Sequence, residues 1–325
     1  MAFIAVLLIA LGEGAFIYSD IDYELSLAPG KQIRAGEGHY TNPLLECDVA
    51  QDSINAPKIN FEPALKEYVA EYKDSNPDIN SIAVYVRYLN NGPTLGVDAE
   101  EEFVPASLLK VPYMMSLYAE ALDNPALLDE KVTLPSGAHL DATQIFPPKH
   151  PLVPGTTYTI DELISHMITE SDNDALKLIS SKFIVSDTHH TEMYQRLGVA
   201  LQRDNDAEIT ITLRQYSAFF RILFNASYLS QKYSEKALSI LTNSTFAEGI
   251  PKDLPSGLEI AHKFGEYESM EKSIFLHDCG IIYYPKVPYL LCIMTKGKNI
   301  DKQLEAIQKV SRFTFDMVNN QYHAF

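Results

Sequence analysis

Residues 105–112 read PASLLKVP and open a strongly apolar segment, SLLKVPYMMSLYAEAL, that covers residues 107–122. The segment predicts a buried helix that begins near Ser107, with a local kink at Pro112. Residues three apart share one face of a helix, so we expect the amine of Lys110 to reach the hydroxyl of Ser107. A serine hydroxyl is a weak nucleophile that needs a neighbouring base, and burial lowers the pKa of a lysine enough to supply one. The alternative is a helix start whose lysine extends to solvent.

A second polar cluster, Ser171-Asp172-Asn173, interrupts the segment TIDELISHMITESDNDALKLI over residues 159–179. The capping-box pattern at residues 159–162 predicts that one helix begins there and ends near the cluster, where another helix starts. At such a junction the hydroxyl of Ser171 suits proton relay to a leaving group. The amide of Asn173 suits a substrate carbonyl and the Lys110 side chain. The alternative is an N-cap for the second helix.

A third segment, His262-Lys263-Phe264-Gly265, lies on the first of three short strands near the end of the chain. A lysine on an edge strand beside a cleft suits a substrate carboxylate, and Gly265 would let a ligand approach the backbone closely. The alternative for Lys263 is an edge-strand lysine that discourages aggregation.

The rest of the pattern gives the fold class. Apolar periodicity predicts a helix, two strands, a block of helices, three strands and a last helix. The expected helices cover residues 61–74, 107–122, 159–179 (as two helices), 211–226, 234–244 and 301–322, and the expected strands cover residues 81–90, 93–101, 258–267, 275–285 and 289–297. The order predicts an α+β domain over residues 61–325, with one antiparallel sheet flanked by helices and an all-helical insertion between strands two and three. Residues 1–60 are expected to form an apolar segment and an irregular arm.

Composition narrows the class of function. The formal net charge is −17 and no basic run is present, which excludes a nucleic-acid binder and suits a small-molecule or peptide substrate. The histidines and cysteines form no metal-ligand pattern, so no metal or other cofactor is expected. The apolar run at residues 2–11 is too short to span a bilayer. It is interpreted either as the remnant of a signal or membrane anchor, which predicts an extracytoplasmic protein, or as an N-terminal element that packs on the domain.

The three cysteines, Cys47, Cys279 and Cys292, are too few and odd in number for a disulfide framework. Cys279 and Cys292 are placed to face each other across a hairpin, so one bridge is an alternative. We expect buried free thiols.

Together the three polar segments resemble the S-x-x-K, S-D-N and K-T-G signature of class A β-lactamases and penicillin-binding proteins, in the same order and on the expected elements. The resemblance covers about residues 61–322. It implies that Ser107 attacks a carbonyl to form an acyl-enzyme and that Lys110 is the base or proton partner. It further implies that Ser171 relays a proton, Asn173 holds the substrate carbonyl, and Lys263 steers the substrate carboxylate.

The resemblance also implies an oxyanion hole formed by the backbone N–H groups of Ser107 and Glu266. Phe146, which precedes the S-D-N segment, is interpreted either as the aromatic wall of the cleft or as part of the core.

Two departures from the family pattern bear on the substrate and on turnover. Phe264 stands where a hydroxyl-bearing residue is usual, and Glu266 stands where a small residue is usual. Both changes predict weaker binding of ordinary β-lactams, because a hydrogen bond is lost and a negative charge is gained. The stretch between Gly198 and Thr212 contains no E-x-x-L-N, the motif whose glutamate activates the deacylating water. The polar residues nearby are interpreted as surface turn residues: Asp204, Asn205, Asp206 and Glu208.

Three hypotheses follow. The first is a class A β-lactamase-like serine hydrolase with slow or atypical deacylation, acting on β-lactams or related D-alanyl-D-alanine amides. The second is a cell-wall DD-peptidase or transpeptidase. The third is a non-catalytic module of the same fold that binds peptidoglycan or protein.

Overall fold

The structure is a computed structural model that describes residues 38–42, 59–90, 92–182, 193–195, 199, 201–203, 208–285 and 287–323. Residue contacts divide the chain into one unit of residues 38–42 and 56–325 and another of residues 1–37 and 43–55. The second unit lies outside the described residues, as do most of the expected N-terminal arm and Cys47.

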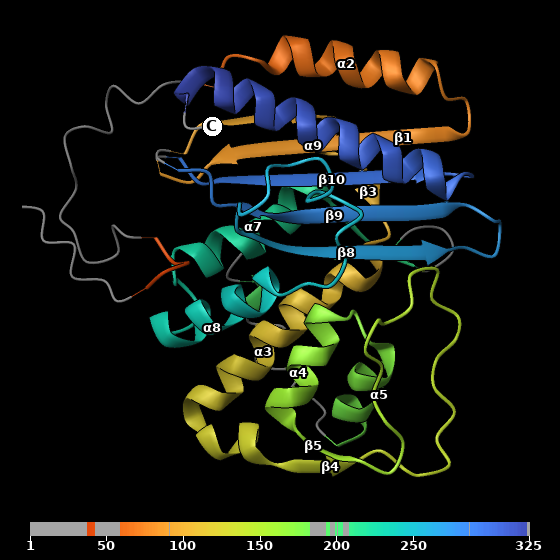
Figure 1. Ribbon diagram of the computed structural model, residues 1–325, viewed down its shortest axis with the longest axis vertical. Helices are drawn as coiled ribbons and strands as arrows, with labels where there is room; N and C mark the ends of the chain where they lie inside the picture. The colour runs from red at the N-terminus through yellow and green to blue at the C-terminus, as the bar shows by residue number, and fades with distance from the viewer. Residues whose placement is uncertain are drawn as a thin grey trace, which may run out of the picture. The chain divides into compact units, whose positions relative to one another are not determined.

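A five-stranded antiparallel sheet forms the centre of the described unit (Figure 1). Its strands stand in the order β2-β1-β10-β9-β8, so the N-terminal hairpin and the C-terminal meander join at the β1–β10 pair. The strands are β1 (Ile79–Tyr88), β2 (Thr94–Val97), β8 (Ile260–Glu268), β9 (Ile274–Ile282) and β10 (Tyr289–Gly297). The expected single antiparallel sheet is therefore confirmed, and β8 is one of its edges.

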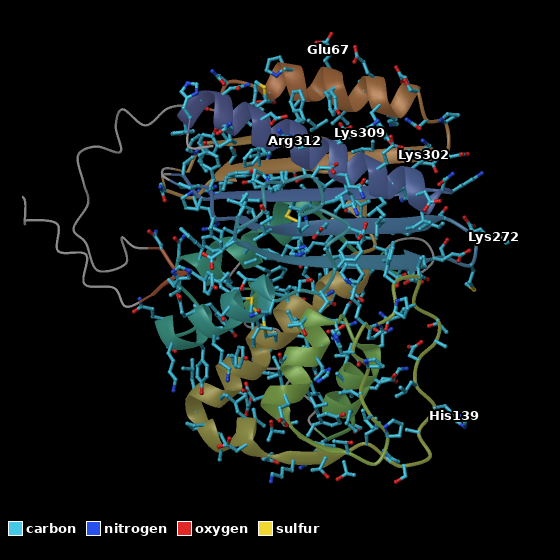
Figure 2. All side chains as sticks on the ribbon, viewed as in Figure 1. Glu67, His139, Lys272, Lys302, Lys309 and Arg312 are labelled. Atoms are coloured by element: carbon cyan, nitrogen blue, oxygen red, sulfur yellow. A yellow bond between two sulfur atoms is a disulfide. The ribbon has the colours of Figure 1, made fainter. Side chains whose placement is uncertain are left out.

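Helices cover both faces of this sheet (Figure 1). On one face, α2 (Glu62–Asp74) and α9 (Ile300–Tyr322) pack on side chains such as Val84 of β1. On the other face lies a helical layer whose core includes the next residue of β1, Tyr85. Successive side chains of a strand point to opposite faces, so this alternation buries the central strands on both sides. The outer face of α9 is charged, with Lys302, Lys309 and Arg312 projecting from it (Figure 2).

The helical layer lies between β2 and β8 in the sequence. Its helices are η2 (Ala106–Leu109), α3 (Lys110–Asp123), η3 (Pro125–Asp129), α4 (Ile160–Thr169), α5 (Asn173–Lys182), α7 (Leu213–Phe224) and α8 (Gln231–Thr242). The layer is not all-helical as expected. It also contains short strand pairs, formed by β3 (Glu102–Phe103), β4 (Lys131–Thr133), β5 (Thr157–Thr159), β6 (Gln202–Arg203) and β7 (Ile209–Thr212). These two- to four-residue strands are too short to show a period in the sequence.

The capping box expected at residues 159–162 is present. The Thr159 hydroxyl accepts from the N–H of Glu162 at 3.1 Å, and the Glu162 carboxylate accepts from the N–H of Thr159 at 2.7 Å. This pair fixes the start of α4, the helix that leads to Ser171.

The expectation of free thiols at Cys279 and Cys292 is wrong, because the two residues form a disulfide. Cys279 of β9 lies directly opposite Cys292 of β10 in the ladder, with their Cα atoms 4.0 Å apart. The bridge is fully buried. Directly opposed residues share one face of a sheet, and Lys263 of β8 is the partner of Cys279 on its other side. The disulfide therefore lies in the same cross-strand row as Lys263.

Residues 38–42 of the expected arm pack on the helical layer. The carboxylate of Glu235 on α8 accepts from the backbone N–H groups of Tyr40 and Thr41 at 2.6 and 2.9 Å. This short segment thus belongs to the same unit as residues 56–325. None of the helices in the described parts of the chain has the length and apolar character needed to cross a membrane.

Candidate active site

Ser107 lies in η2, a short 3-10 turn that leads directly into α3. Ala106, just before it, has a left-handed backbone with φ 51°, so the chain bends sharply into the turn. Left-handed backbone in a residue other than glycine costs free energy and is found mainly where the surrounding structure enforces it. The α-helix begins at Lys110, which places Pro112 in its first turn, where a missing N–H costs nothing. The kink expected at Pro112 is therefore not needed.

Two contacts fix the Ser107 turn against the rest of the fold. The buried hydroxyl of Tyr216 on α7 donates to the carbonyl of Leu108 at 2.9 Å. On the other side, a Cβ atom at Gly265 of β8 would lie 2.9 Å from Leu108 N and 3.0 Å from Pro105 O. Gly265 was expected to admit a ligand backbone. The structure gives a different reason for this glycine, because the protein's own turn at Ser107 occupies that space.

Ser171 lies between α4 and α5 and is fully buried. Like Ala106, it has a left-handed backbone, with φ 55°. Its hydroxyl does not cap α5. The carboxylate of Asp172 does so instead, accepting from the N–H groups of Asp174 and Ala175 at 2.7 and 3.0 Å. The N-cap alternative therefore applies to the second residue of the cluster and leaves Ser171 free for other contacts.

The amine of Lys110 is directed at the S-D-N segment. It donates to Asn173 Oδ1 at 2.7 Å, to the Ser171 carbonyl at 2.5 Å and to the Ser171 hydroxyl at 3.3 Å. Within the described ranges no hydrogen bond joins it to the Ser107 hydroxyl, although both residues border one cavity. Burial lowers the pKa of Lys110 to about 8, against the opposing effect of the carboxylates of Asp172, Glu266 and Asp141. The fold thus places the half-buried Ser107 and a lysine whose pKa is lowered to about 8, Lys110, at one cavity.

Lys263 reaches the same serine from the sheet. Its amine donates to the Ser171 hydroxyl and to the Phe264 carbonyl, each at 2.7 Å. The side chain is fully buried, and burial, followed by the charge of Lys110, lowers its pKa well below the ordinary value. Lys263 is not among the described residues that line the two cavities beside Ser107. This placement suits a charge that acts on Ser171 rather than one in direct contact with a ligand.

Glu266 does face these cavities. Its carboxylate accepts from the backbone N–H of Ile145 at 2.9 Å, and burial raises its pKa above the ordinary value. Phe264, two residues earlier on β8, is buried and stacks on Phe246 with ring centroids 4.0 Å apart. Phe146 packs edge-on against both of these rings. Of the two interpretations of Phe146, the structure supports packing in the core, and its neighbour Ile145 borders the cavity instead.

Two cavities share four lining residues, Ser107, Asn173, Glu266 and Tyr267. The first has a volume of about 420 Å³ and a mainly apolar lining, which includes Tyr113, Leu176, Tyr194, Leu201 and Ile209. The second, about 440 Å³, is lined by polar side chains and by the segment of residues 143–145. A ligand bound at Ser107 therefore meets an apolar and a polar environment on its two sides.

The loop between β4 and β5 contributes contacts to the site that the sequence does not predict. Asp141 accepts from Asn173 Nδ2 at 3.2 Å and from Lys177 Nζ at 3.0 Å, and Gln144 donates to the Ser171 carbonyl at 3.2 Å. The hydrogen bonds from Thr143, ahead of the other contributions, lower the pKa of Asp141 well below its ordinary value. The only local signal was the Asp-x-Thr turn at residues 141–143, which does not indicate a contact with Asn173.

Four residues between Gly198 and Thr212 were interpreted as surface turn residues, and the structure describes one of them. Asp204, Asn205 and Asp206 lie outside the described residues. Glu208 accepts from the Tyr267 hydroxyl at 2.8 Å and is not among the described residues that line the cavities beside Ser107. Nor do the histidine, cysteine and acidic side chains of the described residues form any group that could hold a metal ion.

Comparison with known proteins agrees with this geometry. A model of the beta-lactamase enzyme family matches residues 61–318, and no curated protein sequence matches the chain. A beta-lactamase from Chitinophaga pinensis is 18% identical, with a TM-score of 0.68, over 79% of this chain and 100% of its own. A point mutant of PBP-A, described as an acyl-enzyme complex with penicillin G, is 20% identical over 83% of this chain and 100% of its own, with a TM-score of 0.64. A class A beta-lactamase from Mycobacterium abscessus is 20% identical over 80% of this chain and 100% of its own, with a TM-score of 0.65. At these identities the solved structures establish the fold alone.

Proposed function

The chain belongs to the beta-lactamase enzyme family, and we propose that it is a serine hydrolase in which Ser107 forms an acyl-enzyme with β-lactams or related D-alanyl-D-alanine amides. One observation carries the proposal. Three segments far apart in the sequence place Lys110, Ser171 and Lys263 in one hydrogen-bonded group beside the cavity that Ser107 lines. A merely structural role for these residues gives no reason to bury two lysine amines at one hydroxyl, since burial of charge is costly.

The acylation step follows from the positions of these groups. Ser107 Oγ attacks the substrate carbonyl carbon, and its proton passes to the neutral amine of Lys110. The backbone N–H groups of Ser107 and Glu266 are proposed to stabilise the oxyanion. When the carbon–nitrogen bond breaks, the leaving nitrogen takes the hydroxyl proton of Ser171. The Lys110 ammonium, 3.3 Å from that hydroxyl, returns its proton to Ser171, which restores both groups.

The lining of the first cavity favours slow deacylation. Hydrolysis of the acyl-enzyme needs a water molecule and a base near Ser107. Apart from Glu266, the described residues around this cavity include no carboxylate, and several of them are apolar. This supports the second candidate, a DD-peptidase or transpeptidase of the penicillin-binding kind. The structure of the PBP-A mutant, an acyl-enzyme complex with penicillin G, indicates that a protein of this fold can be captured as such an adduct.

We propose an extracytoplasmic location. The buried Cys279–Cys292 disulfide supports it, because disulfides form and persist mainly in oxidising compartments. The expected cell-wall or antibiotic substrates are also found there.

One experiment separates the candidate functions. The full chain is mixed at high concentration with a chromogenic cephalosporin at millimolar concentration, and both colour and intact mass are followed. A colour change that continues at a steady rate, which shows turnover, supports the hydrolase. A persistent adduct on Ser107 supports the penicillin-binding alternative. Neither signal at high protein concentration would support the non-catalytic module. Ser107→Ala is the control: an adduct that survives this substitution would contradict the proposed nucleophile.

A further inference from the structure

We infer that Glu266 is a specificity-determining residue that selects acyl donors whose leaving group carries a positive charge rather than a carboxylate. The inference rests on the proposed function, because it concerns the same nucleophile and the same cavities. It narrows the substrate class of that site. β-Lactams and peptides whose leaving group carries a carboxylate are then expected to be poor substrates.

β8 offers no exposed cation to a substrate carboxylate. Lys263 is fully buried, and its amine is occupied by the Ser171 hydroxyl and the Phe264 carbonyl. The amine also lies 4.2 Å from the centre of the Phe264 ring, a cation–π contact that stabilises it in this position. The positive charge of this strand is therefore directed into the protein.

The side chains of Phe264 and Glu266 are both unsuited to an anion. Phe264 and Glu266 are two residues apart, so they leave the same face of the strand. The Phe264 ring is buried against Phe246 and offers no hydrogen-bond donor. Glu266 offers only acceptors when it is ionised.

The Glu266 carboxylate is held in place before any ligand arrives. The backbone N–H of Ile145 donates to Oε1 at 2.9 Å, and the N–H of Phe146 contributes a further hydrogen bond. A carboxylate accepts up to about four hydrogen bonds, so acceptor capacity remains for a ligand. Because Glu266 borders both cavities, this capacity is available next to Ser107.

The charged side chains among the described residues that line the polar cavity have one sign. Its described lining residues include two glutamates, Glu266 and Glu268, and no lysine or arginine. The single basic residue of the described lining of the apolar cavity, Lys110, is engaged with Ser171 and Asn173. When Glu266 is ionised, a cationic leaving group beside it is therefore attracted, whereas a carboxylate in the same position meets like charge in a partly desolvated site.

Three thioesters of phenylacetic acid test this inference. Their leaving groups are thiocholine (cationic), 3,3-dimethylbutane-1-thiol (a neutral shape match) and 3-mercaptopropionate (anionic). Thiol release is followed with a thiol-reactive dye. The thiols differ in acidity, so the kcat/KM of each ester is divided by the rate constant of its uncatalysed hydrolysis. We expect this corrected wild-type value to fall in the order cationic, neutral, anionic, with about tenfold between the first and the last. Glu266→Gln keeps acceptors for the two N–H groups and should bring the ratio close to equality. Glu67→Gln, an equal charge change on the exposed face of α2 (Figure 2), should leave the ratio as in the wild type.

The outcomes are distinct. A wild-type preference for the anionic ester, or none among the three, overturns the inference while the proposed function stands. An equal loss of activity of Glu266→Gln toward all three esters also overturns it and indicates a role in turnover. If no ester is cleaved and no acyl adduct forms on Ser107, the proposed function fails and the inference fails with it. The wild-type order decides the question even if Glu266→Gln does not fold.

Discussion

Lys263 Nζ lies 2.7 Å from the hydroxyl oxygen of Ser171, although the two residues are 92 positions apart in the sequence. The contact joins the edge of the sheet to the junction between α4 and α5. Lys110 approaches the same hydroxyl from α3 at 3.3 Å. Two amines on one buried hydroxyl favour release of its proton, which is the property that a proton relay needs.

Lys263→Met should therefore slow acylation of Ser107 by about a hundredfold, the usual scale of general acid–base catalysis. The fold should persist, because methionine is of similar length and removes a buried charge. Adduct formation with a β-lactam, followed by intact mass, measures the rate, and circular dichroism checks the fold. Lys272→Met, an exposed lysine in the β8–β9 turn (Figure 2), is the matched control. An unchanged acylation rate in Lys263→Met would exclude a relay that depends on this lysine.

Acylation should depend on pH through Lys110. Its amine acts as a base only when it is neutral, and its pKa is lowered to about 8. The acylation rate should therefore rise with pH and level off above about 8. Lys177 lowers the pKa of Lys110, so Lys177→Met should raise it and move the midpoint to higher pH. Stopped-flow acylation between pH 6 and 10, a range of roughly two units on either side of the midpoint, measures both profiles. A rate independent of pH over this range would show that another group is the base.

Gly265→Ala should destabilise the protein and slow acylation together. The added Cβ atom would lie 2.9 Å from Leu108 N, a backbone atom of the turn that carries Ser107, so that turn must move. Overpacking of this kind lowers the free energy of unfolding by about 1–3 kcal/mol. Gly137→Ala is the matched control, because nothing lies within 4 Å of its added Cβ atom. Urea denaturation compares the two variants, and equal stability would contradict the close contact.

Counting the free thiols of the protein should show whether the Cys279–Cys292 disulfide is present. The chain has three cysteines, and Cys279 and Cys292 are bridged. Alkylation of the denatured protein should therefore modify one cysteine without reductant, Cys47, and all three after reduction. Intact mass gives both counts. Modification of all three cysteines without reductant would show that Cys279 and Cys292 are free thiols, as the sequence predicts.

The sequence predicts those parts of the site that lie on regular elements. The helix that leads to Ser171 begins at a capping box, and β8 follows from its apolar period, so both could be placed in advance. The turn at Ala106 could not, because its left-handed backbone is imposed by Tyr216 and Gly265 from elsewhere in the fold. A sequence carries no local signal for such long-range contacts.

The same limit explains the other differences. The loop that carries Asp141 and Gln144 has no period, and only its contacts with Asn173 and Ser171 fix it. The disulfide depends on the register of β9 and β10, which a six-residue connection, residues 283–288, leaves undetermined in the sequence. Residue type predicts the chemistry of this site better than it predicts the contacts that hold the site together.

Ala106 and Ser171 have a left-handed backbone, which lowers the stability of the fold at two positions next to the proposed catalytic groups. Glycine would relieve the conformational cost at either position, which amounts to about 1 kcal/mol or more. At position 171 that relief would delete the hydroxyl on which two amines converge, so this cost is inseparable from the chemistry. At position 106 no side-chain chemistry is lost, but the backbone that leads into Ser107 would become more flexible. If the proposed function holds, selection for heat resistance alone would therefore favour changes that lower the activity.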